Sequence, residues 1–281
     1  MKYVPKLVDE EDNYSKDSDW WSAIRIFLRI ILVALAIYMV LGLIVDFFVP
    51  FIPISWENAL SNPILAGVCD MGARSKKYDV KRIQNLLNSL SSLMDTKNQR
   101  PYRVLVVEKK EANALALPGG NIVLFSGLLD EIKSENELAM ILAHELGHFA
   151  NRDHLRGLGR SFLFFVISAA LLGGNNSAAK SFMQSSGVLT NTYSRNQESN
   201  ADKFALALLV KKYGHAGGAI DFFKRLATKE TLPELTHYLS THPASKHRIK
   251  ALQEIIAENK YKIRETRPIF WLKGEYPDQA E

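Results

Sequence analysis

The sequence predicts an α+β fold that is mostly helical, holds a small mixed β-sheet and is preceded by one transmembrane helix. Three observations predict it: a long uncharged apolar stretch near the N-terminus, three short β-branched segments between residues 102 and 126, and helical spacing of apolar residues elsewhere. With 281 residues, the chain is long enough to bury a sizeable core in one large domain or two small ones.

The apolar stretch near the N-terminus predicts a transmembrane helix over residues 25–49. Its central part, 30–45, carries no charge, and the whole stretch is long enough to cross the hydrocarbon of a bilayer. Trp20 and Trp21 at one end are typical of the aromatic belts at membrane interfaces. A buried core helix is the alternative, but a core helix seldom stays apolar on every side for so long.

Basic residues predict the orientation of this helix. Lys16, Arg25 and Arg29 lie before it or at its start, whereas the next basic residue after it is Arg74. The positive-inside rule therefore predicts a cytoplasmic N-terminal tail, residues 1–24, and an extracytoplasmic remainder, which is periplasmic in a Gram-negative bacterium. A cleaved signal peptide fits less well, because the basic region and the apolar core are both too long.

The rest of the chain divides into a linker over residues 50–77, with three prolines and a short helical patch, and one domain over residues 78–281. The net charge of +5 is spread out and is not grouped with aromatic residues, so a nucleic-acid partner is disfavoured. The single cysteine, Cys69, excludes an internal disulfide framework.

The domain begins with apolar residues at helical spacing, which predict a helix over 78–94. Three strands of the small sheet are predicted next, at 102–109, 113–117 and 121–126. Ser134 and Glu137 have the spacing of a capping box and predict the start of the following helix. Later helices are predicted at 195–212, 217–228 and 245–260.

Two segments between these helices have a distinct composition. Residues 162–174 form a second apolar run, which is short for a membrane span. Its length favours a piece of the core or the wall of a groove, with a membrane-dipping or spanning segment as the alternatives. Residues 175–193 are small and polar, and predict a mobile loop.

An H-E-x-x-H motif stands at His144, Glu145 and His148. Residues i and i+4 of a helix share one face, so the two imidazoles can hold one ion, and neutral imidazoles suit zinc. Glu145 lies beside the first ligand and can act as the general base that takes a proton from the attacking water. Stray histidines on a surface helix are the alternative, but the neighbouring residues are apolar and would leave unliganded histidines poorly satisfied.

A catalytic zinc takes three protein ligands, and the residues leave the third one open. His154 has the spacing of a third histidine ligand if Asn151, where glycine is usual, adopts a left-handed turn. Glu198 and Asp202, at i and i+4 of a later helix, are the rival: the first could bind the metal, and the second could accept the outer N–H of His144. Taken alone, such an acidic pair is more typical of a solvated helix face.

Four blocks resemble the gluzincin zinc metallopeptidases of the CAAX prenyl protease and HtpX type, in peptidase family M48. The blocks are "NALALPGGNIVLFSGLL", "LAHELGH", "YSRNQESNAD" and "STHPASKHRI", and they occur in the family's order. The resemblance covers about half of the chain and implies a zincin-like fold. It also implies one zinc ion held by His144, His148 and Glu198, with Glu145 as general base and Asp202 orienting a ligand histidine. His154 would then not be a ligand.

The same resemblance assigns roles to two further blocks. The edge strand Asn113, Ala114, Leu115 and Ala116 would pair with the backbone of an extended substrate, as peptides do at sheet edges. His242 would stabilise the oxyanion or cap the resting zinc, and a helix-entry histidine is the alternative. Arg195 and Arg248 could pair with carboxylates near the site or be structural.

These observations predict a membrane-anchored zinc endopeptidase that acts on polypeptides in envelope protein quality control, with the lipid bilayer as its second partner. A single clear span disfavours processing of prenylated peptides. Two alternatives remain: a chaperone-like protein that holds unfolded chains with a structural metal, and a metzincin that uses His154 as its third ligand.

Overall fold

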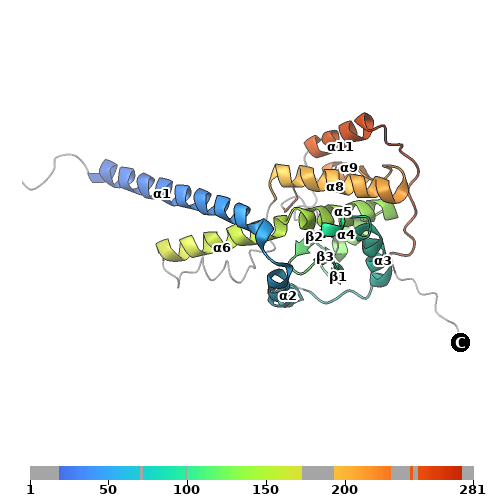
Figure 1. The fold of residues 1–281 in the computed structure, drawn as a ribbon, viewed down its shortest axis with the longest axis horizontal. Helices are drawn as coiled ribbons and strands as arrows, with labels where there is room; N and C mark the ends of the chain where they lie inside the picture. The colour runs from blue at the N-terminus through green and yellow to red at the C-terminus, as the bar shows by residue number, and fades with distance from the viewer. Residues whose placement is uncertain are drawn as a thin grey trace, which may run out of the picture.

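The computed structural model describes residues 19–69, 72–98, 100–172, 193–228, 241–242 and 246–273. Two long helices project from a helical body that holds a three-stranded sheet (Figure 1). This is the predicted α+β fold, mostly helical with a small mixed sheet. The predicted tail as far as residue 18 and the predicted loop 175–193, apart from Tyr193, lie outside the described residues.

The first projecting helix, α1, runs from Asp19 to Phe48 and corresponds to the predicted transmembrane helix. Among the described residues, Trp20–Phe51 is the one helical stretch with the length and composition to cross a membrane, and an 18-residue window within it has a mean hydropathy of 2.7. Its large apolar side chains, including Trp20, Leu32 and Leu43, are mostly exposed. Exposed apolar groups at this density are typical of a surface that a membrane or another protein covers, because each one left in water forgoes stabilisation by burial.

The second projecting helix, α6 (Asp153–Leu172), leaves the body beside α1 and runs along it (Figure 1). Gly159 allows a close approach, because a Cβ there would lie 2.7 Å from Val45 Cγ1. The side chains of Phe162 and Val166 are exposed. The expectation that 162–174 forms core or a groove wall is wrong for these side chains, because α6 points away from the body that would have covered it.

The predicted linker holds more regular structure than the sequence indicates. After the short 3-10 helix η2 (Val49–Phe51), residues Ile54–Cys69 form a 16-residue helix, α2. Ile64 and Leu65 of α2 pack against the face of the sheet that carries Leu115. Helix α2 is therefore packed against the body and is more than a tether.

The sheet has the strand order β1-β3-β2, with β1 (Arg103–Val107), β2 (Ala114–Leu117) and β3 (Asn121–Phe125). Strand β3 pairs in parallel with β1 and antiparallel with β2, so the predicted mixed sheet is confirmed. Gly119 and Gly120 join β2 to β3 with φ values of +82° and +76°. Only glycine adopts such angles readily, which explains the Gly-Gly pair at this turn.

The predicted helices of the body are present in the predicted order: α3 (Val80–Ser91), α5 (Glu135–Ala150), α8 (Arg195–Tyr213), α9 (Asp221–Thr228) and α11 (Lys246–Glu258). The short helix α4 (Ser126–Glu131) and the 3-10 turn η3 (Thr96–Asn98) were not predicted. The predicted cap is present, because the Ser134 side chain accepts a hydrogen bond from Glu137 N. The Glu137 carboxylate bonds Lys133 N and pairs with Arg225.

Helix α5 lies at the centre of the body, and every residue from Asn136 to Phe149 is buried. The sheet packs on one side of α5, and α8 packs against it as well (Figure 1). Gly147 permits this contact, because a Cβ there would lie 2.9 Å from Ala201 Cα. The small residues at 147 and 201 therefore bring the two helices close enough for their polar side chains to meet.

Candidate metal centre

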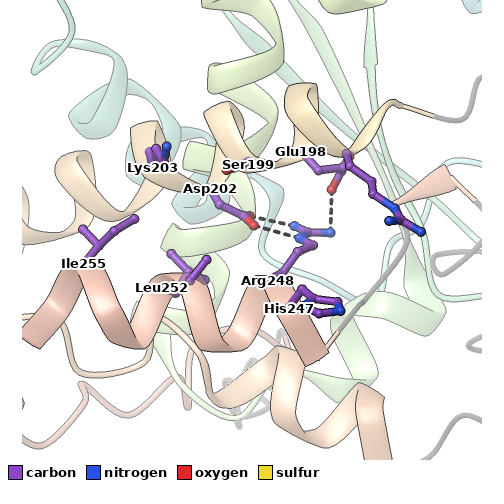
Figure 2. A pocket seen from close by; sticks show the side chains of 10 residues that line it. Glu198, Ser199, Asp202, Lys203, His247, Arg248, Leu252 and Ile255 are labelled. Atoms are coloured by element: carbon purple, nitrogen blue, oxygen red, sulfur yellow. Dashed lines mark hydrogen bonds and ion pairs between the residues drawn. The ribbon is translucent and has the colours of Figure 1, made fainter.

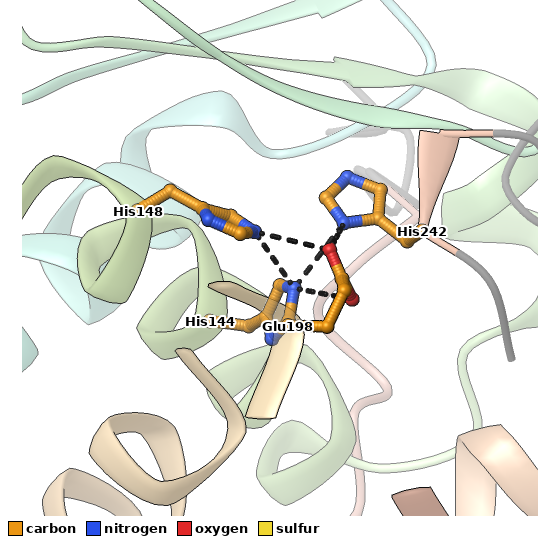
Figure 3. Close-up of side chains that lie close together, drawn as sticks. All are labelled: His144, His148, Glu198 and His242. Atoms are coloured by element: carbon orange, nitrogen blue, oxygen red, sulfur yellow. Dashed lines mark hydrogen bonds and ion pairs between the residues drawn. The ribbon is translucent and has the colours of Figure 1, made fainter. Parts of the chain in front are cut away.

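Four buried side chains converge between α5 and α8: His144, His148, Glu198 and His242. One nitrogen or oxygen of each lies within 4.8 Å of those of the others (Figure 3). The two Nε2 atoms of His144 and His148 are 3.1 Å apart, and His148 Nε2 is 3.4 Å from Glu198 Oε1. His242 Nδ1 lies 2.9 Å from the same Glu198 oxygen and 3.2 Å from His144 Nε2.

Local folding rules account for the positions of three of these residues. His144 and His148 are one turn apart on α5, so their rings project from the same face. Helix α8 begins with a capping box in which Ser194 and Gln197 bond each other's backbone. The box fixes the first turn of α8, and Glu198 in that turn faces α5 where Gly147 allows close packing.

A carboxylate stands behind each of the two α5 histidines. Asp202 Oδ1 lies 3.0 Å from His144 Nδ1, and Asp153 Oδ2 accepts a hydrogen bond from His148 Nδ1 at 3.0 Å. A proton on each Nδ1 leaves a lone pair on each Nε2, and two lone pairs 3.1 Å apart repel unless a cation lies between them. Two imidazoles and a carboxylate are a common zinc ligand set, so these residues fit a zinc ion.

The electrostatics of the centre also favour a cation. Burial alone would lower the pKa of His144, but Glu198 and Asp202 outweigh it and raise the pKa to about 10. Burial would raise the pKa of Glu198, yet His242 and His144 hold that pKa far below its usual range. The carboxylates therefore stay ionised and stabilise positive charge where the imidazoles meet.

Glu145 is fully buried beside the cluster. Among the described residues, neither oxygen of its carboxylate accepts a hydrogen bond. His242 Nε2 lies 3.7 Å from Glu145 Oε1. A buried carboxylate without a donor is costly, so this one is suited to receive a proton or a hydrogen bond from a bound molecule.

Arg248 of α11 joins the two acidic residues of α8. Its Nε and Nη2 donate to Asp202 Oδ2 and Oδ1 at 2.7 and 2.6 Å, and its Nη1 lies 2.5 Å from Glu198 Oε2 (Figure 2). The bidentate pair fixes the Asp202 carboxylate, and the single ion pair from the same guanidinium holds Glu198 beside it. Arg195 is exposed and lines a cavity of about 350 Å³ between α8 and α11, on the side where Arg248 lies.

The predicted substrate strand lies at the edge of the sheet. Strand β2 pairs with β3 on one side, and no strand pairs with its other side among the described residues. Asn113 is buried, and its side-chain oxygen accepts hydrogen bonds from Ala114 N at 2.9 Å and Thr241 Oγ1 at 3.2 Å. The amide oxygen of Asn113 is therefore bonded to the residue next to His242, and this oxygen is already engaged.

His154 lies apart from the four-residue cluster. Its Nε2 is 2.9 Å from Glu57 Oε1 on α2. The left-handed residue of the turn is Arg152, with φ of +56°, while Asn151 keeps a helical conformation. Asn151 therefore does not form the left-handed turn that would direct His154 to the metal. The arrangement with His154 as third ligand, as in a metzincin, is not seen.

Two residues near the cluster were missed by the sequence analysis. Asp153 bonds His148, and the ring of Tyr193 stacks on the His148 ring with centroids 3.7 Å apart. Asp153 follows His148 by five positions, and no helical periodicity relates the two because a turn lies between them. A search for carboxylates just beyond the motif helix would have found it.

Comparison with known proteins agrees with this geometry. The model of peptidase family M48 matches residues 78–256. Mitochondrial metalloendopeptidase OMA1 of Arabidopsis thaliana is 34% identical over 54% of this chain and 31% of its own length. Its namesake in Schizosaccharomyces pombe is 31% identical over 66% of this chain and 55% of its own length. Metalloprotease YcaL of Escherichia coli is 28% identical over 68% of this chain and 74% of its own length.

The chain therefore spans less than two thirds of the length of the two mitochondrial relatives. The family match and these names support the enzyme class that the sequence predicts, a zinc metalloendopeptidase. They concern the family as a whole, so the narrower CAAX prenyl protease or HtpX type stays a prediction.

Proposed function

The chain belongs to peptidase family M48, and from this premise we propose that it is a membrane-anchored zinc endopeptidase that cleaves unfolded envelope proteins. One observation carries the proposal: Glu145 is a buried carboxylate to which no described residue donates a hydrogen bond, and it stands beside the four clustered side chains that could hold a metal ion. A metal site that serves only structure has no use for such a carboxylate.

Three side chains are proposed as the zinc ligands: His144 and His148 through Nε2, and Glu198 through its carboxylate. Asp202 would hold the His144 ring with Nδ1 protonated and Nε2 directed at the ion, and Asp153 would do the same for His148.

When bound, zinc would polarise the scissile carbonyl and acidify a neighbouring water molecule. Glu145 would take the proton of that water as it attacks, and would then pass the proton to the leaving amine nitrogen. His242 would donate a hydrogen bond to the carbonyl oxygen as it gains negative charge. Each role needs a side chain at the cluster, and both residues lie there.

The substrate is proposed to bind as an added strand along β2, at Ala114, Leu115 and Ala116. Main-chain pairing recognises an extended chain whatever its side chains are. Folded proteins seldom offer such a strand, whereas damaged or misassembled proteins do. This preference is the physical basis for a role in protein quality control.

Removal of the metal tests the proposal. We expect a chelator to abolish cleavage of an unfolded protein such as reduced casein, and zinc at stoichiometric amount to restore it, because the proposed chemistry needs the Lewis acid. Magnesium should not restore activity, since imidazole ligands suit it poorly. The measurement is release of acid-soluble peptide over time. Cleavage that continues in the metal-free protein would refute the proposal.

One observation favours a second function. Because His242 Nδ1 lies 2.9 Å from Glu198 Oε1, four protein side chains converge, and four protein ligands are typical of a structural zinc site. The chain would then hold unfolded polypeptides at the β2 edge without cleaving them.

The membrane is proposed to contain α1 and the distal part of α6. The two helices lie side by side, and both expose large apolar side chains there, such as Phe162 of α6. Nearer the body, Asp46 of α1 pairs with Arg156 and Arg160 of α6, which suits the polar interface of a bilayer. The N-terminal tail would be cytoplasmic and the body extracytoplasmic.

Labelling of single cysteines in spheroplasts tests this topology. In a Cys69→Ser background, we expect a membrane-impermeant maleimide to label Glu254→Cys, because the side chain at residue 254 lies on the exposed face of α11. Ser15→Cys in the tail should react only after lysis, and Phe162→Cys should not react until detergent is added. Labelling of residue 15 but not of residue 254 would show that the orientation is the reverse of the proposed one. Ready labelling of residue 162 without detergent would show that α6 does not lie in the bilayer.

A further inference from the structure

The turn that follows the motif helix is held by the chain segment just after α1. Arg152, between α5 and α6, has a φ of +56°, which is unusual for a residue with a side chain. Its Nη1 donates hydrogen bonds to the carbonyl oxygens of Val49 at 3.1 Å and Ile52 at 2.5 Å. A residue keeps an unfavourable backbone conformation of this kind only when surrounding contacts hold it there, and these two hydrogen bonds are among those contacts.

A second tether joins the same turn to α2 through a buried ion-pair cluster. Glu57 of α2 is 1% exposed and His154 of α6 is 4% exposed. Glu57 Oε1 accepts hydrogen bonds from His154 Nε2 at 2.9 Å and Gly119 N at 3.1 Å, and its Oε2 accepts one from Arg100 at 2.8 Å. The distances from His154 and Arg100, 2.9 and 2.8 Å, suit charge-assisted bonds to the carboxylate.

The charge on Glu57 is secured by these partners. Burial would raise the pKa of Glu57, but the bonds from His154 and Arg100 outweigh it and hold the pKa at about 2. The carboxylate is thus ionised at neutral pH and binds both neighbours. It joins α2, the β2–β3 turn and the start of α6 at one buried point.

Asp153 lies in the chain between the two tethered residues. Its Oδ2 accepts the hydrogen bond from His148 Nδ1 at 3.0 Å, and its Oδ1 accepts one from Gln197 Nε2 at 3.0 Å. The position of Asp153, and through it the ring of His148, therefore depends on where Arg152 and His154 are held.

We infer that Glu57 is a positioning residue for the metal centre, acting through His154 and Asp153 on His148, so that helix α2 belongs to the catalytic unit. The inference rests on the metal site proposed above. It assigns a task to the third histidine of the motif region, which is no zinc ligand here. It also means that a chain starting at Tyr78, where the family match begins, would lack part of the support of its metal site.

The test compares His154→Leu, which removes the donor to Glu57, with His154→Gln, whose amide can donate from a similar place. Metal-free full-length protein is titrated with zinc chloride against a chromogenic chelator, and kcat and KM are measured at saturating zinc. We expect His154→Leu to raise the zinc dissociation constant about tenfold, at the low end of the range for loss of an outer partner of a metal ligand, because His154 acts on that partner, Asp153, indirectly. Its kcat should fall with little change in KM, and His154→Gln should retain most of both properties.

A matched control separates positioning from stability. His215→Leu removes another buried histidine, whose Nδ1 accepts a hydrogen bond from Gly217 N at 3.0 Å outside the metal centre. This control should lower the melting temperature without changing the zinc dissociation constant. The inference is wrong if His154→Leu behaves like the control. Should His154→Leu fail to fold, Glu57→Gln decides by the same titration, with weaker zinc binding supporting the inference and unchanged binding overturning it.

The titration also distinguishes the two proposals. A wild-type protein that binds no zinc refutes the metal site and, with it, this inference. Tight binding by both the wild type and His154→Leu refutes the inference alone.

Discussion

A Glu145→Gln variant is expected to cleave an unfolded protein about 10²- to 10⁴-fold more slowly than the wild type, which is the usual contribution of a general base. Glutamine has nearly the same size as glutamate but cannot take a proton. Glu145 is not one of the four clustered side chains, so zinc binding should stay unchanged. The buried pocket around residue 145 accepts the amide without a cavity, and the fold should persist.

Cleavage rate and zinc content are measured on the same preparations, with Glu254→Gln as the control because Glu254 is an exposed carboxylate on α11. The same experiment separates the two candidate functions. A peptidase loses activity in Glu145→Gln while still binding unfolded chains. Equal cleavage by variant and wild type would exclude Glu145 as the base, and absence of cleavage from both would favour the holding function.

A Glu198→Ala variant is expected to lose zinc. Loss of an outer partner of a ligand weakens metal binding by about 10- to 100-fold, so loss of a ligand itself should exceed that range. The fold should tolerate the truncation of Glu198, because the buried Arg248 keeps both of its hydrogen bonds to Asp202. Zinc content after dialysis and the circular dichroism spectrum are the measurements.

The comparison with His154→Leu makes this prediction decisive for the identity of the third ligand. If Glu198 is the ligand, Glu198→Ala loses far more affinity for zinc than His154→Leu does. The opposite ranking would mean that His154 moves to the metal when zinc binds, and would restore the metzincin alternative. Equal, small losses would mean that neither residue is a ligand.

Much of the fold follows from local patterns. The strands at residues 102–126 and the motif helix with its Ser134 cap are present as predicted, because turn residues, alternation and capping act over a few residues. The prolines of residues 50–77 favour a linker with only a short helical patch. In the structure that patch is the 16-residue helix α2, whose Ile64 and Leu65 cover a sheet face that lies about 50 residues further along the chain.

The second apolar run, residues 162–174, also differs from its prediction, but here the structure exposes side chains that the sequence predicts to be buried. Its length is typical of a buried segment, yet Phe162 and Val166 are exposed because α6 follows α1 away from the body. The composition and length of this run do not indicate that it will pack beside α1. The direction in which α6 leaves the body is set by the left-handed turn at Arg152, which is held by carbonyl groups about 100 residues earlier.

The sequence by itself determined that a helix carries His144, Glu145 and His148 on adjoining positions, because a spacing of four residues brings side chains to one face of any helix. Tertiary structure decided which other residues join them. Glu198 reaches the cluster because Gly147 lets α8 pack closely on α5, and His154 is drawn away to Glu57, 97 residues earlier in the chain. The composition of the site thus depends on long-range packing, which residue spacing alone does not encode. Glu198 could be predicted only because its block resembles that of a known family.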